Sequence, residues 1–251
     1  SNFAVGDHVF GTAGPEFGAN AEYICIPEDG VICTKPTNVT FTEAASSVDG
    51  FLTSLPFLRD HGLIKKGDKI LINGASGSVG SAAVQIAKYY GAEVTAVCST
   101  DNIAWVKSIG ADHVIDYTKE DFTTKHNHYD IIFDTVGKTT FSKCKKMLVR
   151  KGIFLQAAID FDIFKWVIWT SIFGSKKAKI AATGLRAPVE RLEDLKLLKR
   201  LMEQGFIQPV IDRSYTLNEI TSAHDYVDQG RKKGNVAIIV NKHISMTQKA
   251  V

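Results

Sequence analysis

Cysteine is scarce in this chain, and its spacing excludes the usual cysteine-based sites. Only four of the 251 residues are cysteines, at positions 25, 33, 98 and 144. No two of them have the C-x-x-C spacing of a zinc knuckle or a dithiol redox centre. A reduced, intracellular protein is the simplest interpretation, and we expect a cytoplasmic location. The chain does not begin with methionine, so a targeting segment upstream of Ser1 stays open.

Long hydrophobic runs and a large excess of either charge are also missing. The formal net charge is +3 and the basic residues are scattered, which argues against nucleic acid or a membrane as a partner. The most apolar stretch, residues 161–174, is interrupted by Asp162 and Lys165 and is too short to span a bilayer. We interpret it as a helix packed on the protein or at a subunit contact, or as a flap over a hydrophobic substrate.

Two common catalytic signatures are absent. No tyrosine is followed by a lysine four residues later, as a short-chain dehydrogenase would require. The Gly-x-Ser-x-Gly elbow of serine hydrolases is also missing, although the segment that starts at Gly74 comes close. These absences exclude two enzyme classes that share an α/β fold.

The most informative feature that the sequence does contain is a glycine-rich turn between a strand and a helix. An apolar run at residues 70–72 predicts a buried strand, and a helical pattern begins near Ser78. Between and beside them lie Gly74, Gly77 and Gly80. This order brings backbone N–H groups at a helix N-terminus against a pyrophosphate. The turn therefore predicts a dinucleotide site.

Strands and helices alternate after this turn, which predicts a parallel sheet covered on both faces. Strands are expected at 69–73, 93–98, 113–117, 129–134, 152–158 and 179–182, and helices at 78–90, 102–109, 140–148 and 189–204. Before this region, β structure is expected at 5–11, 21–27 and 31–36, followed by a helix that continues to residue 61. After it, strands at 207–211 and 235–240 flank a helix at 218–229.

The end of the second strand of this sheet bears on which nucleotide is bound. An NAD-binding protein carries a carboxylate there, about 20 residues after the glycines, on the ribose 2′-hydroxyl. Here that position holds Cys98, followed by the hydroxyls of Ser99 and Thr100. Hydroxyl donors suit a 2′-phosphate and favour NADP(H) over NAD(H), although Asp101 could turn inward and no arginine follows. Tyr117, at the end of the third strand, could contact the 2′-phosphate or adenine.

Several short motifs together resemble one family. They occur in this order: Gly6-Asp7-His-Val-Phe10, Ala21-Glu22-Tyr23, Lys35-Pro36, Glu43-Ala44-Ala45, Leu52-Thr53, Gly74-Ala-Ser-Gly-Ser-Val-Gly80, Gly110-Ala111-Asp112, Phe133-Asp134-Thr-Val-Gly137 and Gly234-Asn235-Val236. In combination they resemble the medium-chain dehydrogenase/reductase superfamily, and most closely its zinc-independent quinone oxidoreductase branch. The resemblance runs from about residue 3 to residue 241.

The resemblance implies an α/β fold with two parts, a Rossmann doubly wound parallel sheet and a GroES-like β-barrel catalytic domain that is only partial here. Residues 1–50 would belong to the catalytic domain, residues 51–185 to the Rossmann domain, and residues 186–251 to its final helix and the return to the catalytic domain. Roughly 80 residues of the usual barrel opening and the structural zinc lobe have no counterpart. The family often dimerises through a sheet edge, so a homodimer is expected.

The resemblance also implies which residues bind the cofactor. Ser76, Gly77, Ser78, Val79 and Gly80 match the pyrophosphate turn. The 2′-phosphate neighbourhood is matched by Ser99, Thr100 and Tyr117, and the nicotinamide neighbourhood by Thr53, Val136 and Asn235. No residue is singled out as the proton donor; Tyr23 and Asp49 are the candidates, and Asp49 is interpreted as a loop or helix-cap residue.

These features favour an oxidoreductase that transfers hydride from NADPH to a quinone, an enone or a related small carbonyl substrate without a metal. Two other interpretations stay open. The chain could bind NADPH without catalysis, as a regulatory protein or fragment. It could also be a zinc alcohol dehydrogenase whose ligands lie in the missing N-terminal segment.

Overall fold

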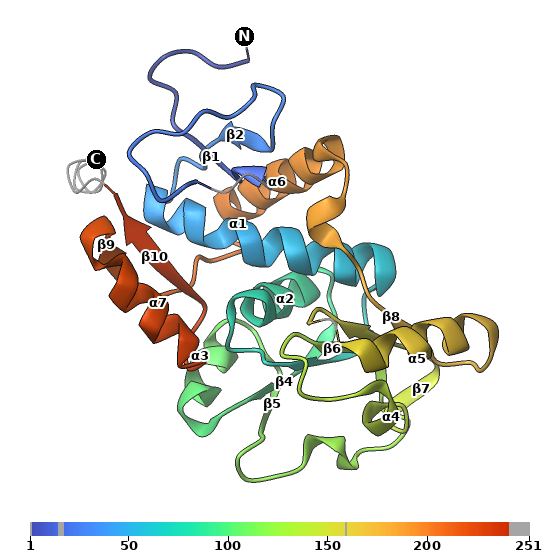
Figure 1. The fold of residues 1–251 in the computed structure, drawn as a ribbon. Helices are drawn as coiled ribbons and strands as arrows, with labels where there is room; N and C mark the ends of the chain where they lie inside the picture. Colours follow the sequence, from blue (N-terminus) through green and yellow to red (C-terminus); the bar gives the residue numbers. More distant parts are fainter. Residues whose placement is uncertain (1, 15–17, 159, 241–251) are drawn as a thin grey trace. The chain divides into compact units, whose positions relative to one another are not determined.

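The structure is a computed structural model that describes residues 2–14, 18–158 and 160–240 (Figure 1). Contacts divide the chain into two compact units. One comprises residues 53–183, and the other comprises residues 1–52 together with 184–251.

Residues 53–183 form a parallel six-stranded sheet in the order β5-β4-β3-β6-β7-β8. Its strands are β3 (Lys69–Asn73), β4 (Glu93–Cys98), β5 (His113–Asp116), β6 (Tyr129–Asp134), β7 (Leu148–Gln156) and β8 (Lys177–Lys179). The connections include α2 (Ser78–Tyr89), α3 (Ile103–Ser108), α4 (Phe141–Cys144) and α5 (Phe161–Ile172). The chain starts at β3, winds outward through β4 and β5, and then returns to β6 on the other side. This order is that of a Rossmann fold, with its switch point between β3 and β6.

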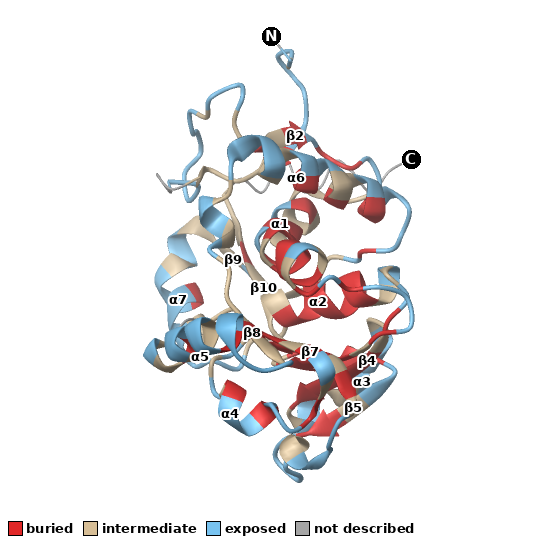
Figure 2. Cartoon of the chain, turned by 90° about the vertical axis from the view of Figure 1, so that its right-hand side faces the viewer, coloured by how far each residue is buried: buried red, intermediate tan, exposed pale blue. Residues whose placement is uncertain are grey.

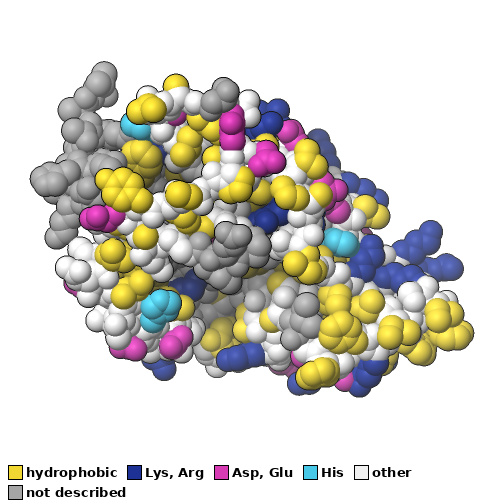
Figure 3. Space-filling view, turned by 45° about the horizontal axis from the view of Figure 1, so that its top comes forward, with side chains coloured by type: hydrophobic (Ala, Val, Ile, Leu, Met, Phe, Trp, Pro, Cys, Tyr) yellow, Lys and Arg dark blue, Asp and Glu magenta, His cyan; other side chains and the backbone are white. Residues whose placement is uncertain are grey.

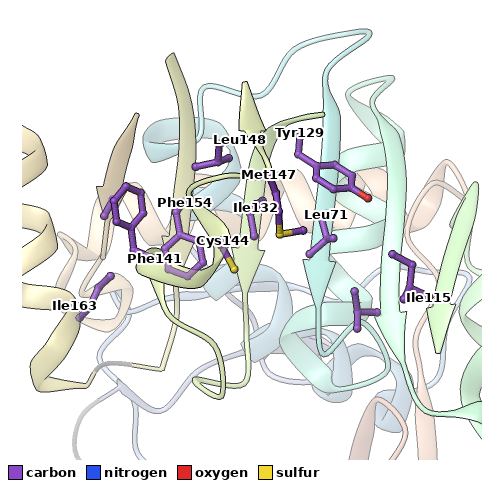
Figure 4. Close-up of a cluster of buried hydrophobic side chains, with 12 residues drawn as sticks. Leu71, Ile115, Tyr129, Ile132, Phe141, Cys144, Met147, Leu148, Phe154 and Ile163 are labelled. Carbon is purple, nitrogen blue, oxygen red and sulfur yellow. The ribbon is translucent and has the colours of Figure 1, made fainter. Parts of the chain in front are cut away.

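Both faces of this sheet are buried, which explains why its strands are continuous apolar runs. On one face, Leu71, Ile132 and Phe154 pack in a cluster with side chains of α4 and α5, including Phe141 and Ile163 (Figure 4). On the other face, the ring of Phe133 lies 5.0 Å from that of Phe57. The buried face of α2 also contacts β3 and β4 (Figure 2).

The other unit is built from two small sheets and from helices. Strands β1 (Val9–Gly11) and β2 (Ile32–Thr34) pair antiparallel, and β9 (Ile211–Thr216) pairs parallel with β10 (Asn235–Ile239). Its helices are α6 (Pro188–Glu203) and α7 (Ile220–Asp228), and most of α1 (Phe41–Pro56) also belongs to it. Thr40 begins α1 through a capping box with Glu43.

Several expected elements differ from the structure. Residues 21–27 form no strand, because the alternation of side chains there has no hydrogen-bonded partner among the described residues. The helix expected at 140–148 stops at Cys144, and β7 already begins at Leu148. The strand expected at 207–211 instead runs from Ile211 to Thr216, and the helix that reaches residue 61 ends in a π-helical turn, Phe57–His61.

Candidate dinucleotide-binding site

The glycine-rich turn lies at the switch point of the sheet and is held by the neighbouring strands. The backbone N–H groups of Gly74 and Ala75 both donate to the carbonyl of Val97 at 3.1 Å, which ties the turn to the end of β4. Gly74 has a φ of +80°, and a Cβ there would lie 2.2 Å from Val136 Cγ2 at the end of β6. The turn therefore packs closely against the ends of both neighbouring strands.

The remaining two glycines of the turn meet different surroundings. A Cβ on Gly80 would lie 2.1 Å from the carbonyl oxygen of Gly74, so only glycine allows α2 to begin this close to the turn. Gly77 has φ −81° and ψ 179°, which any residue adopts, and its Cβ would meet Gly74 O at an ordinary 3.6 Å. The fold therefore requires glycine at position 80 but not at position 77. A glycine that the fold does not need fits a backbone that a ligand approaches closely.

The start of α2 fits a phosphate group. Helix α2 has twelve residues, and its N-terminal N–H groups carry partial positive charge. Ser78, its first residue, has a buried hydroxyl oxygen without a hydrogen-bond partner in the described part of the chain. A buried polar atom of this kind is uncommon in a folded protein. A pyrophosphate oxygen at this helix end would give the Ser78 hydroxyl its missing partner.

The residues expected near the nicotinamide have different placements. Ser54 donates from its hydroxyl to the carbonyl of Val79 at 2.7 Å, so Thr53, the preceding residue on α1, lies beside the start of α2. Val136 follows β6 and is 42 % exposed, next to the glycine-rich turn. Asn235 belongs to the other unit, where its side-chain amide donates to the carbonyl of Val210 at 3.1 Å.

Asp134, at the end of β6, holds the loop that carries Val136. Its side chain is fully buried and accepts from Asn73 Nδ2 at 2.9 Å, from Val136 N at 3.1 Å and from Gly137 N at 3.3 Å. Burial raises the pKa of this carboxyl above its usual value, although these hydrogen bonds oppose the change. The Asp134 carboxyl therefore fixes the loop at the switch point and has no contact with solvent.

The hydroxyl residues after β4 lie beside a carboxylate that sequence analysis missed. Asp116, at the end of β5, is directly opposite Cys98 in the strand register and is buried. It accepts from Thr100 Oγ1 at 2.5 Å and from Thr118 Oγ1 at 2.6 Å. These two hydrogen bonds lower its pKa to about 2, so it stays ionised. The Thr100 hydroxyl therefore donates its hydrogen to Asp116 and has none left to donate to a ligand.

Other donors surround this carboxylate. Lys119 Nζ lies 3.7 Å from Asp116 Oδ2, and the Lys119 side chain is 67 % exposed. Ser99 Oγ accepts from Asn102 Nδ2 at 3.0 Å, which leaves the Ser99 hydroxyl hydrogen able to donate. Tyr117 is 57 % exposed, and its N–H donates to the carbonyl of Cys98 at 3.2 Å. Lys119 supplies the positive charge that the sequence after β4 lacks.

The remaining candidates carry no evident chemistry. Tyr23 is 90 % exposed, and Asp49 lies exposed within α1 rather than in a loop or at a cap. Burial raises the pKa of the Cys33, Cys98 and Cys144 thiols to about 11, so these thiols stay protonated. No group of three or more metal-ligating side chains is found in the described ranges. Within the same ranges, every helix is too short or too polar to cross a membrane.

Comparisons with known proteins give this chain a family. The model of the zinc-binding dehydrogenase family matches residues 109–238, slightly more than half of the chain. A 2-methylene-furan-3-one reductase of Solanum lycopersicum is 32% identical over 93% of this chain and 57% of its own length. An NADPH-dependent alkenal/one oxidoreductase (chloroplastic) of Arabidopsis thaliana is 30% identical over 89% of this chain and 53% of its own. The chain thus spans somewhat more than half the length of these relatives.

A solved structure supports the same assignment. The quinone oxidoreductase from Coxiella burnetii has a TM-score of 0.84 and 28% identity, over 96% of this chain and 74% of the other. The likeness covers the Rossmann sheet and the residues of the partial GroES-like part. The chain belongs to the zinc-binding dehydrogenase family, within the medium-chain dehydrogenase/reductase superfamily.

Proposed function

We propose that this protein is an NADPH-dependent oxidoreductase that transfers hydride to a quinone or an enone. The observation that carries the proposal is the glycine-rich turn, with its unpartnered Ser78 hydroxyl at the start of α2. The names of the relatives, a 2-methylene-furan-3-one reductase, an alkenal/one oxidoreductase and a quinone oxidoreductase, support conjugated carbonyl substrates. The cofactor itself supplies the hydride chemistry when bound.

In this proposal, the residues of the chain bind the cofactor and orient it. The N–H groups of Ser78 and Val79 in the first turn of α2 bind the pyrophosphate, and the Ser78 hydroxyl donates to one of its oxygens. Val136, held by Asp134, gives the nicotinamide an apolar contact, with Thr53 beside the start of α2. Asn235 is proposed as a further cofactor-binding residue. No side chain is assigned as the proton donor.

Turnover tests the reaction directly. We expect the purified protein to oxidise NADPH when a naphthoquinone or an α,β-unsaturated ketone is added, followed as loss of absorbance of the reduced nicotinamide. Tight NADPH binding without turnover on either substrate would instead support the non-catalytic alternative. Turnover that depends on bound zinc in the same preparation would support the zinc-dependent alternative.

Cofactor selectivity is proposed to depend on Lys119. Because Thr100 donates its hydrogen to Asp116, the donors left for a 2′-phosphate are Ser99, Tyr117 and the Lys119 ammonium. We expect Lys119→Gln to weaken NADPH binding about fivefold, equivalent to ~1 kcal/mol, because an exposed charge on a phosphate contributes that much. NADH binding should not change.

The control for this variant is Lys107→Gln, which removes an exposed lysine from the last turn of α3. Calorimetric titration of both cofactors against both variants gives the four affinities that are needed. Equal weakening of NADPH and NADH by Lys119→Gln would mean that Lys119 does not distinguish them.

A further inference from the structure

Helix α5 presents an apolar stripe to solvent. Phe161, Phe164, Ile168 and Ile172 follow a spacing of three, four and four residues and are exposed by 95, 45, 65 and 70 %. This spacing places all four on one side of the helix. The opposite side, with Ile163 and Thr170, is buried against the sheet, and Ala178 N of β8 donates to Thr170 Oγ1. The fold therefore buries one side of α5 and leaves a second apolar side exposed to solvent.

Two further aromatic side chains extend this stripe. Trp169 and Phe173 are 51 and 56 % exposed, and their rings lie 5.9 Å apart. Figure 2 colours most of α5 as exposed. A contiguous exposed apolar surface is rare on a soluble protein and marks an interaction site. We call these six residues, Phe161, Phe164, Ile168, Trp169, Ile172 and Phe173, the α5 stripe.

Lysines border the α5 stripe. Lys165 lies on the helix itself. Lys177 donates to the carbonyl of Thr170 near the C-terminal end of this helix. Lys145 Nζ lies 5.5 Å from the ring centroid of Trp166, and Lys176 donates to the carbonyl of Lys145. Figure 3 shows basic side chains beside hydrophobic ones on its right-hand side, where α5 lies in Figure 1.

Acidic groups nearby offset only part of these charges. The carboxylate on α5 is Asp162, which pairs with Lys165 and accepts from Trp166 Nε1 at 3.1 Å. Asp160 accepts from the N–H of Ile163 as the helix cap. The lysines outnumber these two carboxylates by four to two. Although the net charge of the whole chain is low, local positive charge therefore borders the apolar surface of α5.

We propose that the α5 stripe docks on an anionic membrane surface, with its apolar side chains among the lipid chains and its lysines on the headgroups. A helix of twelve residues is about 18 Å long and cannot span a bilayer, so it would lie in the interface. Apolar and aromatic residues with lysines at the polar margin are the composition of such interfacial helices.

Charge favours a lipid surface over a second copy of the chain as the partner of the α5 stripe. A twofold contact through the α5 stripe would bring the same lysines of two copies together, and like charges across an interface are unfavourable. An anionic lipid surface instead complements them. Docking would also bring the protein to the phase in which apolar quinones dissolve, although the docking itself needs neither quinone nor cofactor.

Vesicle flotation of the full 251-residue chain tests the proposal without cofactor or substrate. We expect binding to phosphatidylcholine vesicles that contain phosphatidylglycerol, and much weaker binding to phosphatidylcholine alone or in high salt. The double variant Phe164→Ser with Ile168→Ser should lose at least about tenfold in binding. Lys176→Gln should lose roughly fivefold on anionic vesicles only.

Leu185→Ser is the matched control, because it removes an apolar side chain that is 87 % exposed but lies outside α5. It should bind vesicles as the unaltered chain does. Absence of binding to anionic vesicles would overturn the proposal, as would equal binding to neutral vesicles. Concentration-dependent dimers that the Phe164/Ile168 variant abolishes would assign the α5 stripe to a second copy instead. NADPH affinity, measured separately, should be the same in all variants, so this test and that of the proposed reaction fail independently.

Discussion

Replacing Gly77 by alanine is expected to weaken NADPH binding at least about tenfold while the protein stays folded. The backbone of Gly77 is in a conformation that alanine adopts, and the new Cβ would meet its nearest neighbour, Gly74 O, at 3.6 Å. The methyl group would instead occupy the space above the start of α2, where we propose that the pyrophosphate lies. We expect NADPH affinity to fall by at least about tenfold, ~1.4 kcal/mol, in a calorimetric titration.

Gly80→Ala provides the contrasting result. Its Cβ would lie 2.1 Å from Gly74 O and 2.8 Å from Ala75 Cα, both backbone atoms, so α2 would have to move. Overpacking of this kind costs about 1–3 kcal/mol or more of unfolding free energy, measurable by urea denaturation. If Gly77→Ala bound NADPH normally, or lost stability as Gly80→Ala is expected to, the pyrophosphate would not lie at this turn.

The second large effect is expected at Asp134. Substitution by alanine leaves the amide of Asn73 and the N–H groups of Val136 and Gly137 without their buried acceptor. Each unsatisfied buried donor costs about 1–3 kcal/mol, so Asp134→Ala should lower the unfolding free energy by roughly 3 kcal/mol or more. Asp134→Asn keeps one acceptor oxygen and should lose much less. Urea denaturation of both variants measures the difference.

The same carboxyl predicts the sign of a pH effect. Burial raises its pKa in the folded state above the ordinary value of 3.8, so the folded protein holds this proton to higher pH than the unfolded chain does. Stability from this group is therefore full below pH 3.8 and falls as the pH rises through the folded pKa. Asp134→Asn should flatten this part of the pH profile.

Asp130→Asn, at the other end of β6, is the control for this profile. Its carboxylate accepts from the N–H of Lys69 at 2.9 Å, outside the loop that carries Val136. The Asp130 variant should still lose stability as the pH rises through the folded pKa of Asp134. A profile that Asp134→Asn leaves unchanged would mean that the Asp134 carboxyl is ionised in the folded state as readily as in the unfolded chain.

The sequence was sufficient for the features that depend on local pattern. The apolar run at 70–72, the glycines after it and the regular alternation of strands and helices predicted a parallel sheet, which the structure confirms; the Rossmann order of its strands was implied by the family resemblance and is also confirmed. The local patterns need no knowledge of which strands are adjacent.

What the sequence did not reveal depends on strand register. Asp116 lies 16 residues after Thr100, and its contact with that hydroxyl exists because β5 pairs with β4 so that Asp116 faces Cys98. Spacing alone does not give that pairing. Lys119 reaches the same carboxylate from the turn after β5. An acidic residue at the carboxyl end of a neighbouring strand was the signal that could have identified this cluster.

Burial also limited what the sequence alone could predict. The stretch 161–174 has too few polar residues to show which of its sides the fold buries, because both sides of α5 are apolar. Residues 21–27 form no strand for a different reason. Their alternation of polar and apolar side chains is regular, but alternation alone does not provide a neighbouring strand to hydrogen-bond with. Both cases depend on long-range partners.

The central claim is that the glycine-rich turn of this chain binds a nicotinamide dinucleotide through its pyrophosphate. The most direct measurement is a calorimetric titration of the purified chain with NADPH, repeated with Gly77→Ala. Saturable binding to the unaltered chain, together with at least a tenfold loss in the folded variant, is the predicted result. Absence of NADPH and NADH binding to the folded, unaltered chain would contradict the account.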